Sequence, residues 1–267
     1  MRILYLHRCD TDCRKRLERF IESLNNQAVR HNGSIELQVV VKAHDKKDLI
    51  LVEEQLSNCR YKVNELIELP DDGFDLGAYS RAVDLIPNKP TLFLNSHSWF
   101  RDRDAVDSML DVSENILSDT IIGTSSSHSS LNWQLASRSI ASLIFFPVAL
   151  SWRKNSDPSF PVTPNPHIRS NGFICMSESL RQYFSTRKFP MTKYDCHQIE
   201  SGTDNLTNYF LNALVLYKSG LYNVSKEVFG GFRCNKQENL LINDNQVSKY
   251  DNASYLKKRL YHYRSFQ

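Results

Sequence analysis

The sequence has no long hydrophobic run. No stretch of its 267 residues approaches the roughly 18 consecutive apolar residues that indicate a membrane-spanning helix. The longest apolar run, residues 140–150, is interrupted by Ser142 and Pro147. Residues 1–6 lack the apolar region and the small-residue cleavage site of a signal peptide, and their pattern is that of a first strand. We therefore expect a cytoplasmic protein, with contact at the inner face of a membrane as an open alternative.

The sequence also has little net charge. Its formal charge is +3, from 33 Lys and Arg against 30 Asp and Glu. This balance lacks the basic bias of nucleic-acid-binding proteins, so we expect no nucleic acid as a partner, whereas phosphate-bearing small ligands remain compatible. Hydrophobic residues make up 41% and charged residues 24%, as in ordinary globular proteins. No repeat or low-complexity segment is present, and the length suits one large domain.

The six cysteines form neither a disulfide framework nor a zinc motif. They are scattered along a long chain, which is typical of free thiols in a reducing compartment. Cys9 and Cys13 would share a helical face near His7, but a zinc site needs more ligands at better spacing. We therefore expect no structural metal at this position.

Strand and helix patterns alternate through the first 125 residues. Short apolar or β-branched runs predict strands, and apolar residues at three- and four-residue spacing predict the helices between them. The predicted strands are 2–6, 35–41, 61–69, 91–94 and 119–123, and the predicted helices are 14–29, 48–58, 76–87 and 102–117. This alternation predicts an α/β fold in which helices flank a mostly parallel sheet.

The second half of the chain is less regular. We predict a strand at 168–176 and helices at 177–185 and 204–219. The last helix is predicted from apolar residues that recur at three- and four-residue spacing: Leu206, Phe210, Ala213, Leu214 and Tyr217. No clear domain boundary separates the two halves, so we expect a single domain.

Two polar clusters follow predicted strands in the first half. The first runs from Asp71 through Gly73 and Asp75 to Gly77 and leads into a helix, and the second is Asn95-Ser96-His97 after strand 91–94. Ligands of open α/β sheets bind beyond the carboxyl ends of the strands, where both clusters would lie. The two glycines would let backbone approach a ligand closely, and the helix start would offer free N–H groups to a phosphate.

These two clusters resemble the GT-A glycosyltransferases, especially rhamnan-synthesis and lipopolysaccharide transferases of bacterial surface polysaccharides. In that family a loop with Asn-x-Gly enters a helix, and a later strand ends in an Asp-x-Asp that holds a divalent metal on the donor diphosphate. Asp72-Gly73 and Gly77 stand in the first place, and Asn95-Ser96-His97 stand in the second. The resemblance covers the architecture of residues 1–125 and the motifs of residues 70–98.

The resemblance implies a GT-A-like single domain that transfers a sugar from a nucleotide-sugar donor to a glycan or lipid-linked acceptor in polysaccharide biosynthesis. Residues 1–125 would bind the nucleotide sugar, and residues 126–267 would bind the acceptor. A membrane-bound acceptor would suit the basic and aromatic tail at 255–264, which would otherwise be an ordinary terminal helix.

The metal motif departs from the family pattern, because Asn95 and His97 replace its two aspartates. Neither an amide nor a neutral imidazole brings negative charge, so the affinity for Mn²⁺ or Mg²⁺ should fall. Three interpretations remain open. Asn95 and His97 hold a weakly bound metal, positive side chains neutralise the diphosphate without a metal, or the site is inactive.

Further donor-binding candidates come from the other strand ends. Asp75 would hold ribose or sugar hydroxyls, or act as the N-cap of the helix. Lys42 ends the second strand, which the resemblance places near the nucleotide base, or it is a solvated strand terminus. Arg8 follows the first strand and would meet the diphosphate, or belong to a basic surface. Asp72, Gly73, Gly77, Asn95, Ser96 and His97 complete the predicted donor set.

The acceptor candidates lie in the second half. His167, Arg169 and Asn171 form a polar cluster that would bind sugar hydroxyls or a phosphate, or simply make a turn. Glu200 and Asp204 precede or open the predicted helix 204–219, where the resemblance places the carboxylate that removes the acceptor's proton during inversion. The alternative for this segment is a helix cap. Asp244, in a later polar cluster, would close over a ligand or form a surface turn.

Two other functions remain open. A non-catalytic GT-A-like domain that binds glycans or proteins would explain the missing Asp-x-Asp. A sugar-nucleotide nucleotidyltransferase would share the α/β layout, but it usually needs a Gly-rich basic loop after the first strand, and residues 7–16 contain no glycine.

Overall fold

The computed structural model describes residues 1–30, 35–131, 157–161, 165–225 and 237–259. The apolar run 140–150 and residues 260–264 of the tail lie outside these ranges. Within the described ranges, no helix is both long and apolar enough to cross a membrane. Five cysteines are described, Cys9, Cys13, Cys59, Cys175 and Cys196, and all five are free thiols.

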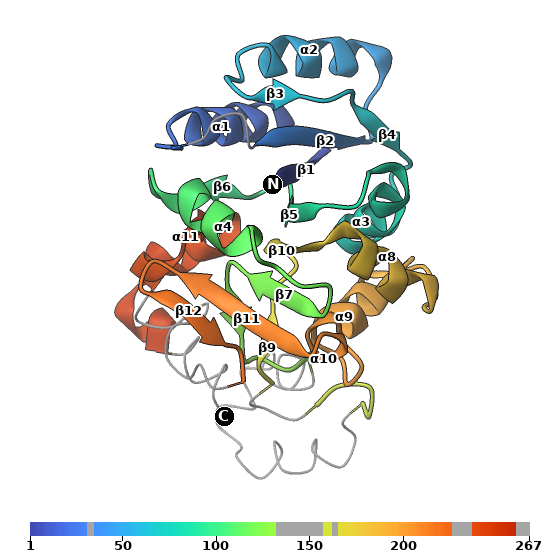
Figure 1. Ribbon diagram of the computed structural model, residues 1–267, viewed down its shortest axis with the longest axis vertical. Coiled ribbons are helices and arrows are strands. Elements are labelled where there is room, and N and C mark those ends of the chain that lie inside the picture. Colours follow the sequence, from blue (N-terminus) through green and yellow to red (C-terminus); the bar gives the residue numbers. More distant parts are fainter. Residues whose placement is uncertain (31–34, 132–156, 162–164, 226–236, 260–267) are drawn as a thin grey trace.

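A nine-stranded mixed sheet forms the centre of the protein. Its strand order is β12-β11-β7-β10-β5-β1-β2-β3, and β4 also pairs with β2 (Figure 1). Strands β10 and β12 run antiparallel to their neighbours, and all the other pairings are parallel. The strands are β1 Arg2–Arg8, β2 Glu36–Lys42, β3 Lys62–Val63, β4 Ile67–Leu69, β5 Pro90–Leu94, β7 Thr120–Gly123, β10 Gly172–Met176, β11 Asn212–Tyr217 and β12 Gly220–Asn223.

Helices cover both faces of this sheet (Figure 1). Alternate residues of β1 divide between two cores: Ile3 and Tyr5 pack with α1, α2 and α4, whereas Leu4 and Leu6 pack with α3 and α8. The helices are α1 Cys13–Asn25, α2 Lys46–Leu56, α3 Phe74–Leu85, α4 Ala105–Ser113, α8 Ser177–Ser185, α9 Lys193–Ser201, α10 Leu206–Tyr209 and α11 Asn245–Asp251. The predicted α/β fold with a mostly parallel sheet is confirmed.

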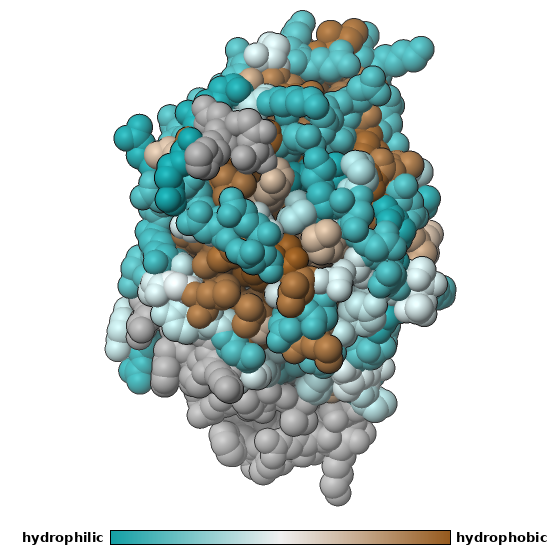
Figure 2. Space-filling view, in the orientation of Figure 1, coloured by the Kyte–Doolittle hydropathy of each residue, from teal (hydrophilic) through white to brown (hydrophobic). Residues whose placement is uncertain are grey.

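Both predicted halves contribute strands to the one sheet, since β10, β11 and β12 follow residue 125. Two short ribbons lie beside it. Strand β6, Trp99–Phe100, pairs with β13, Ile242–Asn243, and β8, Ser126–Ser127, pairs with β9, His167–Ile168. Hydrophilic residues cover much of the surface seen in Figure 2, and apolar residues gather near its middle, around α4 and β7.

The predicted helix at 204–219 is wrong. Only Leu206–Tyr209 is helical, and Asn212–Tyr217 is strand β11, paired with β7 on one side and β12 on the other. Over a short run, the apolar spacing of this segment fits the helical period as well as the strand period. The segment becomes a strand because it pairs with its neighbours in the sheet. The predicted strand 168–176 is also divided, because residues 169–171 separate β9 from β10.

One edge of the sheet gathers the segments that matter for function. Strands β1, β2, β5 and β7 end at this edge, and the antiparallel β10 begins there, with Gly172 opposite Leu94. Gly172 is required by close packing, since a Cβ at this position would lie 2.4 Å from Oγ1 of Thr124. The residues just before Gly172 therefore lie beside the residues just after β5.

Candidate functional site

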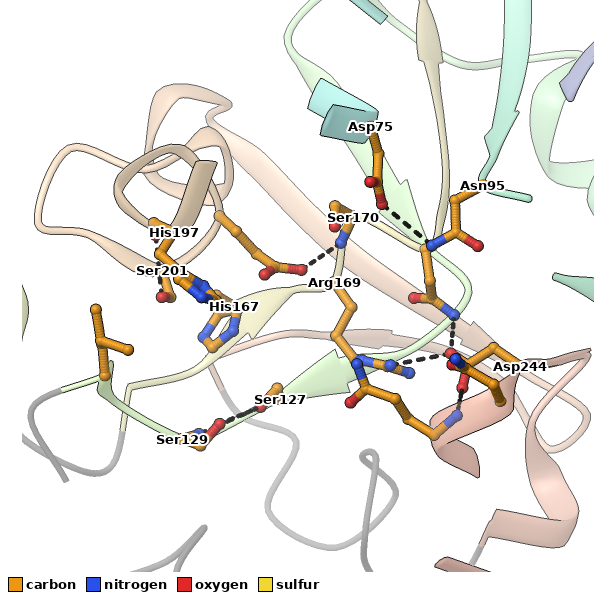
Figure 3. A pocket seen from close by; sticks show the side chains of 15 residues that line it. Asp75, Asn95, Ser127, Ser129, His167, Arg169, Ser170, His197, Ser201 and Asp244 are labelled. Atoms are coloured by element: carbon orange, nitrogen blue, oxygen red, sulfur yellow. Dashed lines mark hydrogen bonds and ion pairs between the residues drawn. The ribbon is translucent and has the colours of Figure 1, made fainter. Parts of the chain in front are cut away.

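A polar cavity of about 180 Å³ lies at this edge. Figure 3 shows side chains from several elements converging on it. Asp75 comes from α3, Asn95 from the turn after β5, Glu200 from α9, and Arg169 from the link between β9 and β10. The other lining residues are Ser127, Ser129, Leu131, His167, Ser170, Asn171, His197, Ser201, Asp244, Asn245 and Gln246.

Asp75 lies in the first turn of α3. The helix begins after Gly73, whose φ of 65° is left-handed, and Phe74 shares this geometry with a φ of 52°. The N-cap is Gly73, so the alternative that Asp75 caps the helix is wrong. One carboxylate oxygen accepts a hydrogen bond from Nδ2 of Asn95 at 3.2 Å. Burial raises the pKa of Asp75, the Asn95 hydrogen bond opposes the shift, and the charge of Glu200 adds to it.

Asn95 closes the turn that follows β5. Its Oδ1 accepts hydrogen bonds from the backbone N–H of His97 at 3.1 Å and from Oγ of Ser98 at 2.9 Å. Both lone pairs of this oxygen are therefore in use. The half-buried His97 has its pKa lowered by burial and by the nearby charge of Arg16. The neighbouring Ser96 is buried, and its carbonyl accepts a hydrogen bond from the hydroxyl of Tyr5.

In the arrangement that the structure shows, Asn95 and His97 do not form a binding site for a divalent metal. The oxygen of Asn95 is engaged within the turn, which leaves His97 as a single nitrogen ligand. In the described ranges no group of three or more His, Cys, Asp or Glu is placed to hold a metal ion. We therefore derive no chemical step through a metal at Asn95 and His97.

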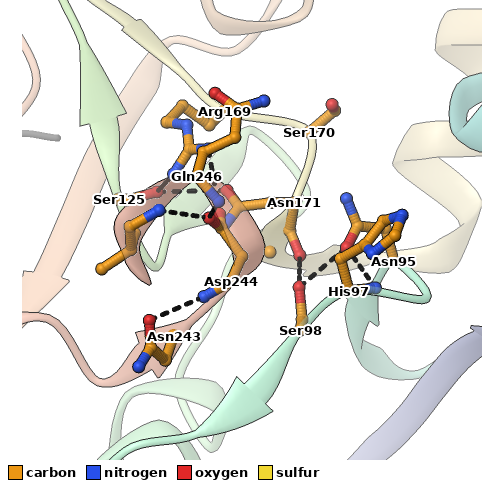
Figure 4. Close-up of polar contacts among 12 residues, drawn as sticks. Asn95, His97, Ser98, Ser125, Arg169, Ser170, Asn171, Asn243, Asp244 and Gln246 are labelled. Carbon is orange, nitrogen blue, oxygen red and sulfur yellow. Dashed lines mark hydrogen bonds and ion pairs between the residues drawn. The ribbon is translucent and has the colours of Figure 1, made fainter. Parts of the chain in front are cut away.

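A buried ion pair closes another side of the cavity (Figure 4). Nη2 of Arg169 lies 2.9 Å from Oδ2 of Asp244, and the two side chains are 8% and 3% exposed. Nδ2 of Asn171 donates to the same oxygen at 2.8 Å, and Oγ of Ser125 donates to Oδ1 of Asn171 at 3.1 Å. Arg169 and Asn171 thus line the cavity and are bound to protein partners there, and their contact with an acceptor stays a prediction.

Asp244 is buried, so its interpretation as a surface turn is wrong. Its Oδ1 accepts the backbone N–H groups of Gln246 and Val247, both at 2.7 Å, as the N-cap of α11. The pair with Arg169 uses its other oxygen. One carboxylate therefore holds the start of α11 against the link between β9 and β10.

Glu200 lies in the last turn of α9, and the prediction that it precedes a long helix is wrong. Its Oε1 accepts the backbone N–H of Ser170 at 2.7 Å, which holds the carboxylate at the cavity wall. His167 lies nearby and is buried, with Nδ1 at 2.7 Å from the carbonyl oxygen of Asn165. Burial lowers the pKa of His167, and the charge of Glu200 opposes this shift.

Asp204 lies outside the polar cavity. Its carboxylate pairs with Nη2 of Arg187 at 2.8 Å, and the side chain is 82% exposed. The structure thus separates the two predicted catalytic carboxylates and brings only Glu200 together with Asp75 and Asn95.

Lys42 lies beneath the Asp71–Asp75 loop rather than on its surface. The Nζ atom, on a side chain 1% exposed, donates to the carbonyl oxygens of Asp72 and Phe74 and so supports the left-handed turn. Burial lowers the pKa of Lys42, and nearby carboxylates, Asp71 first, oppose the shift. Contact between Lys42 and a ligand stays a prediction.

The remaining predicted donor residues also have protein neighbours. Both nitrogens Nε and Nη2 of Arg8 bind the carboxylate of Asp71 at 2.8 Å, and this pairing lowers the pKa of Asp71. Asp72 pairs with Arg81 at 2.7 Å. A Cβ at Gly73 or Gly77 would meet the ring of Phe189, at 2.7 Å and 3.0 Å. The close approach at these glycines is therefore to a phenylalanine, and contact with a ligand stays a prediction.

No family model and no curated protein matches this chain. Several solved glycosyltransferase structures are similar to it. The apo form of mouse xyloside xylosyltransferase 1 is 9% identical over 78% of this chain and 79% of that chain, with a TM-score of 0.44. The galactosyltransferase LgtC, in complex with donor and acceptor sugar analogues, is 11% identical over 68% of this chain and 60% of that chain, with a TM-score of 0.42.

Residues 1–349 of TarS from S. aureus are 16% identical over 46% of this chain and 35% of that chain, with a TM-score of 0.35. The chain therefore spans about a third of that protein segment. At these identities and TM-scores we draw no conclusion from the three structures about the fold or the activity of this chain.

Sequence reasoning missed several residues of the cavity. Ser127 and Ser129 come from a serine-rich segment to which the sequence analysis assigned no role, and His197 and Ser201 come from α9. No spacing or motif marks these four residues as ligand-binding. Only the pairing of β8 with β9 and the packing of α9 bring them to the same edge.

Proposed function

We propose that this protein is a glycosyltransferase that moves a sugar from a nucleotide-sugar donor to a glycan or lipid-linked acceptor in polysaccharide biosynthesis, with inversion. The observation that carries the proposal is the meeting of Asp75, Asn95 and Glu200 in one polar cavity. This cavity lies beyond the carboxyl ends of parallel strands, where α/β proteins bind ligands. The sequence resemblance over residues 70–98 adds support from the same loop and turn.

The cavity suits a single sugar ring. Its lining offers carboxylates, amides and hydroxyls, the groups that form hydrogen bonds with sugar hydroxyls, and few apolar side chains. Asp75 and Asn95 would bind hydroxyls of the donor sugar from one side. Ser127, Ser129 and His167 would contact the acceptor from the other side, in the second half of the chain.

Glu200 is our candidate for the general base. One carboxylate oxygen is held by the backbone N–H of Ser170, which orients the group toward the cavity. As the acceptor hydroxyl oxygen forms a bond with the anomeric carbon, Glu200 takes the hydroxyl proton. The bond between that carbon and the phosphate oxygen breaks, and the nucleoside diphosphate leaves with the electron pair. Arg169 and Asp244 fix the wall against which the sugar would lie.

Selective binding of a nucleotide sugar tests this function. UDP-, GDP-, CMP- and dTDP-sugars are each added to the protein, and the melting temperature and heat of binding are measured. A ligand that binds only the folded state raises its stability. We expect one donor class to bind, and to bind more tightly than its nucleotide alone, because the cavity holds the sugar.

The variant Asp75→Ala sharpens this test. It should remove the preference for the nucleotide sugar over the nucleotide, whereas Asp84→Ala, at an exposed position near the end of the same helix, should keep it. Absence of binding by every donor class would reject the transferase.

A non-catalytic domain is the second candidate, because the oxygen of Asn95 is engaged within its own turn. Such a domain would bind a glycan or a protein without consuming a nucleotide sugar. Prolonged incubation with the bound donor distinguishes the two candidates. Release of the free nucleotide, through transfer or slow hydrolysis, supports the enzyme.

We also infer that a lipid-linked acceptor would be reached by peripheral contact with a membrane. Tyr255 and Leu256 are 72% and 76% exposed, and the basic residues Lys257, Lys258 and Arg259 follow them. Exposed apolar and basic side chains together suit an anionic lipid surface. Sedimentation with vesicles that contain phosphatidylglycerol should fall in the double variant Tyr255→Ser/Leu256→Ser, and unchanged sedimentation would reject this contact.

A further inference from the structure

A second cavity lies on the other side of the Asn95–Ser98 turn. It measures about 400 Å³. The turn contributes Asn95 to the polar cavity and His97 to this second one, and Asn245 lines both. The two cavities are therefore neighbours along the same edge of the sheet.

The second cavity is basic. Lys15, Arg16 and Arg19 line it from α1, and one carboxylate, Asp12, lines it as well. Arg19 comes four residues after Lys15 and three after Arg16, so it lies on the same face of the helix as each of them. We call this cavity, lined by Lys15, Arg16 and Arg19, the basic cavity.

Two of these cations are fixed in place. Nη2 of Arg16 lies 2.6 Å from Oδ1 of Asp10 and also donates to the carbonyl oxygen of Arg8. The Nε of Arg16 is buried and has no hydrogen-bond partner in the described structure. The guanidinium of Arg19 lies 4.7 Å from the centre of the Trp99 ring. A buried donor without a partner is costly unless a ligand supplies the acceptor.

The volumes of the two cavities show why both are needed. Pockets for ligands of drug size measure about 300–1,000 Å³. The polar cavity, at about 180 Å³, is too small for a whole nucleotide sugar. The rest of the donor must extend into a neighbouring space, and the basic cavity is large enough and shares Asn245 with it.

A third cavity fits this role less well. It is about 320 Å³ in volume and is lined by Arg187 and Lys188, together with Asp195 and Asp204. Its two cations are balanced by two carboxylates, and Arg187 is paired with Asp204. It also shares no lining residue with the polar cavity.

We propose that Lys15, Arg16 and Arg19 bind the diphosphate of the donor in the basic cavity, in place of a metal at Asn95 and His97. This inference rests on the proposed transferase function and names the groups that stabilise the leaving diphosphate. Charge-assisted hydrogen bonds from guanidinium and ammonium groups suit phosphate oxygens, and all three cations line this one cavity. Fixed cations next to the sugar stabilise the negative charge that develops as the diphosphate leaves.

Calorimetric titration in EDTA tests the proposal, with UDP, GDP, CDP and dTDP as probes. The double variant Lys15→Gln/Arg19→Gln removes two exposed cations and leaves the anchored Arg16 in place. We expect the wild type to bind one nucleoside diphosphate without metal. The double variant should bind it about 10- to 100-fold more weakly, as the loss of hydrogen bonds to a charged group predicts.

Arg14→Gln is the matched control, because Arg14 is an exposed cation on α1 that does not line the basic cavity. It should bind as the wild type does. Equal affinity of the wild type and the double variant would overturn the assignment of the diphosphate to this cavity. It would not affect the proposed transferase function. Failure of every nucleoside diphosphate and every nucleotide sugar to bind the wild type, with and without Mn²⁺, would reject the proposed function itself.

Discussion

Arg169 and Asp244 form a buried ion pair, with 2.9 Å between Nη2 and Oδ2, although 75 positions separate them in the sequence. The pair joins the start of β10 to the start of α11, because Asp244 is also the N-cap of that helix. Both side chains are nearly inaccessible to water, so the loss of one charge leaves the other buried without its partner.

Asp244→Asn should therefore destabilise the protein by about 3–5 kcal/mol, the usual cost of breaking a buried pair on one side. Urea unfolding measures the change. Asp251→Asn, on the same helix and in a partly exposed pair with Arg101, should cost about 0–1 kcal/mol. Similar losses in the two variants would contradict the buried role of Asp244.

Glu200→Gln should lower the rate of sugar transfer by about 100-fold or more, because an amide cannot accept the acceptor's proton. Its oxygen can still accept the N–H of Ser170, so donor binding should not change. The measurement is single-turnover transfer together with donor titration. Asp204→Asn, outside the cavity, should keep its activity. Near-normal turnover by Glu200→Gln would remove Glu200 as the base.

Lys42→Met should destabilise the loop that carries Asp75. The ammonium group donates to two carbonyl oxygens in that loop, and methionine leaves both without this donor. Hydrogen bonds from a charged group predict a loss of about 1–3 kcal/mol in the free energy of unfolding. Lys47→Met, at an exposed position of α2, should change it by less than about 0.5 kcal/mol. Equal stability of the two variants would argue against this role.

Gly172→Ala should cost about 1–3 kcal/mol, because the new Cβ would lie 2.4 Å from Oγ1 of Thr124. Replacing Thr124 with Ala removes that oxygen. The double variant should therefore be more stable than the sum of the two single changes predicts, and a double-mutant cycle by urea unfolding measures this coupling. Simple additivity would show that the contact with Thr124 is not what requires glycine.

His7 makes the stability of the protein depend on pH. Its ring is buried, neither ring nitrogen has a hydrogen-bond partner in the described structure, and burial lowers its pKa to about 3. Below pH 6.5 the unfolded chain therefore binds a proton that the folded chain does not. The free energy of unfolding therefore decreases as the pH is lowered below 6.5, by at most about 1.4 kcal/mol per pH unit for this group.

His7→Leu should reduce this slope between pH 6.5 and pH 5, a window above the titration of most carboxylates. Urea unfolding of the wild type and the variant at several pH values measures the difference. Identical slopes would mean that His7 has the same pKa in the folded and the unfolded protein.

Local pattern predicted most of the first half of the fold. Its strands and helices alternate at the expected periods, and helix α3 follows the polar loop as predicted. The prediction of a helix at 204–219 failed because a short apolar run fits both a helix and a strand. Whether such a run becomes a strand depends on a free partner, and here β7 supplies one.

The residues of the candidate site were also predicted only in part. The edge rule for α/β sheets identified Asp75 and Asn95, which follow neighbouring elements of the first half. The pairing of Arg169 with Asp244 had no local signal, since it depends on an antiparallel β10 and on the position of α11. The burial of Lys42 was missed for a related reason, because a lysine at the end of a strand is usually solvated.

The polar cavity is assembled from segments that extend from Asp75 to Gln246. A chain that stops folding part-way, or a fragment that ends before Asp244, would lack one wall of it. A molecule that binds there should therefore stabilise all of these segments together against unfolding. A protease should then cut the protein more slowly, even at sites far from the ligand. Resistance to proteolysis would then report ligand binding even before the reaction itself has been observed.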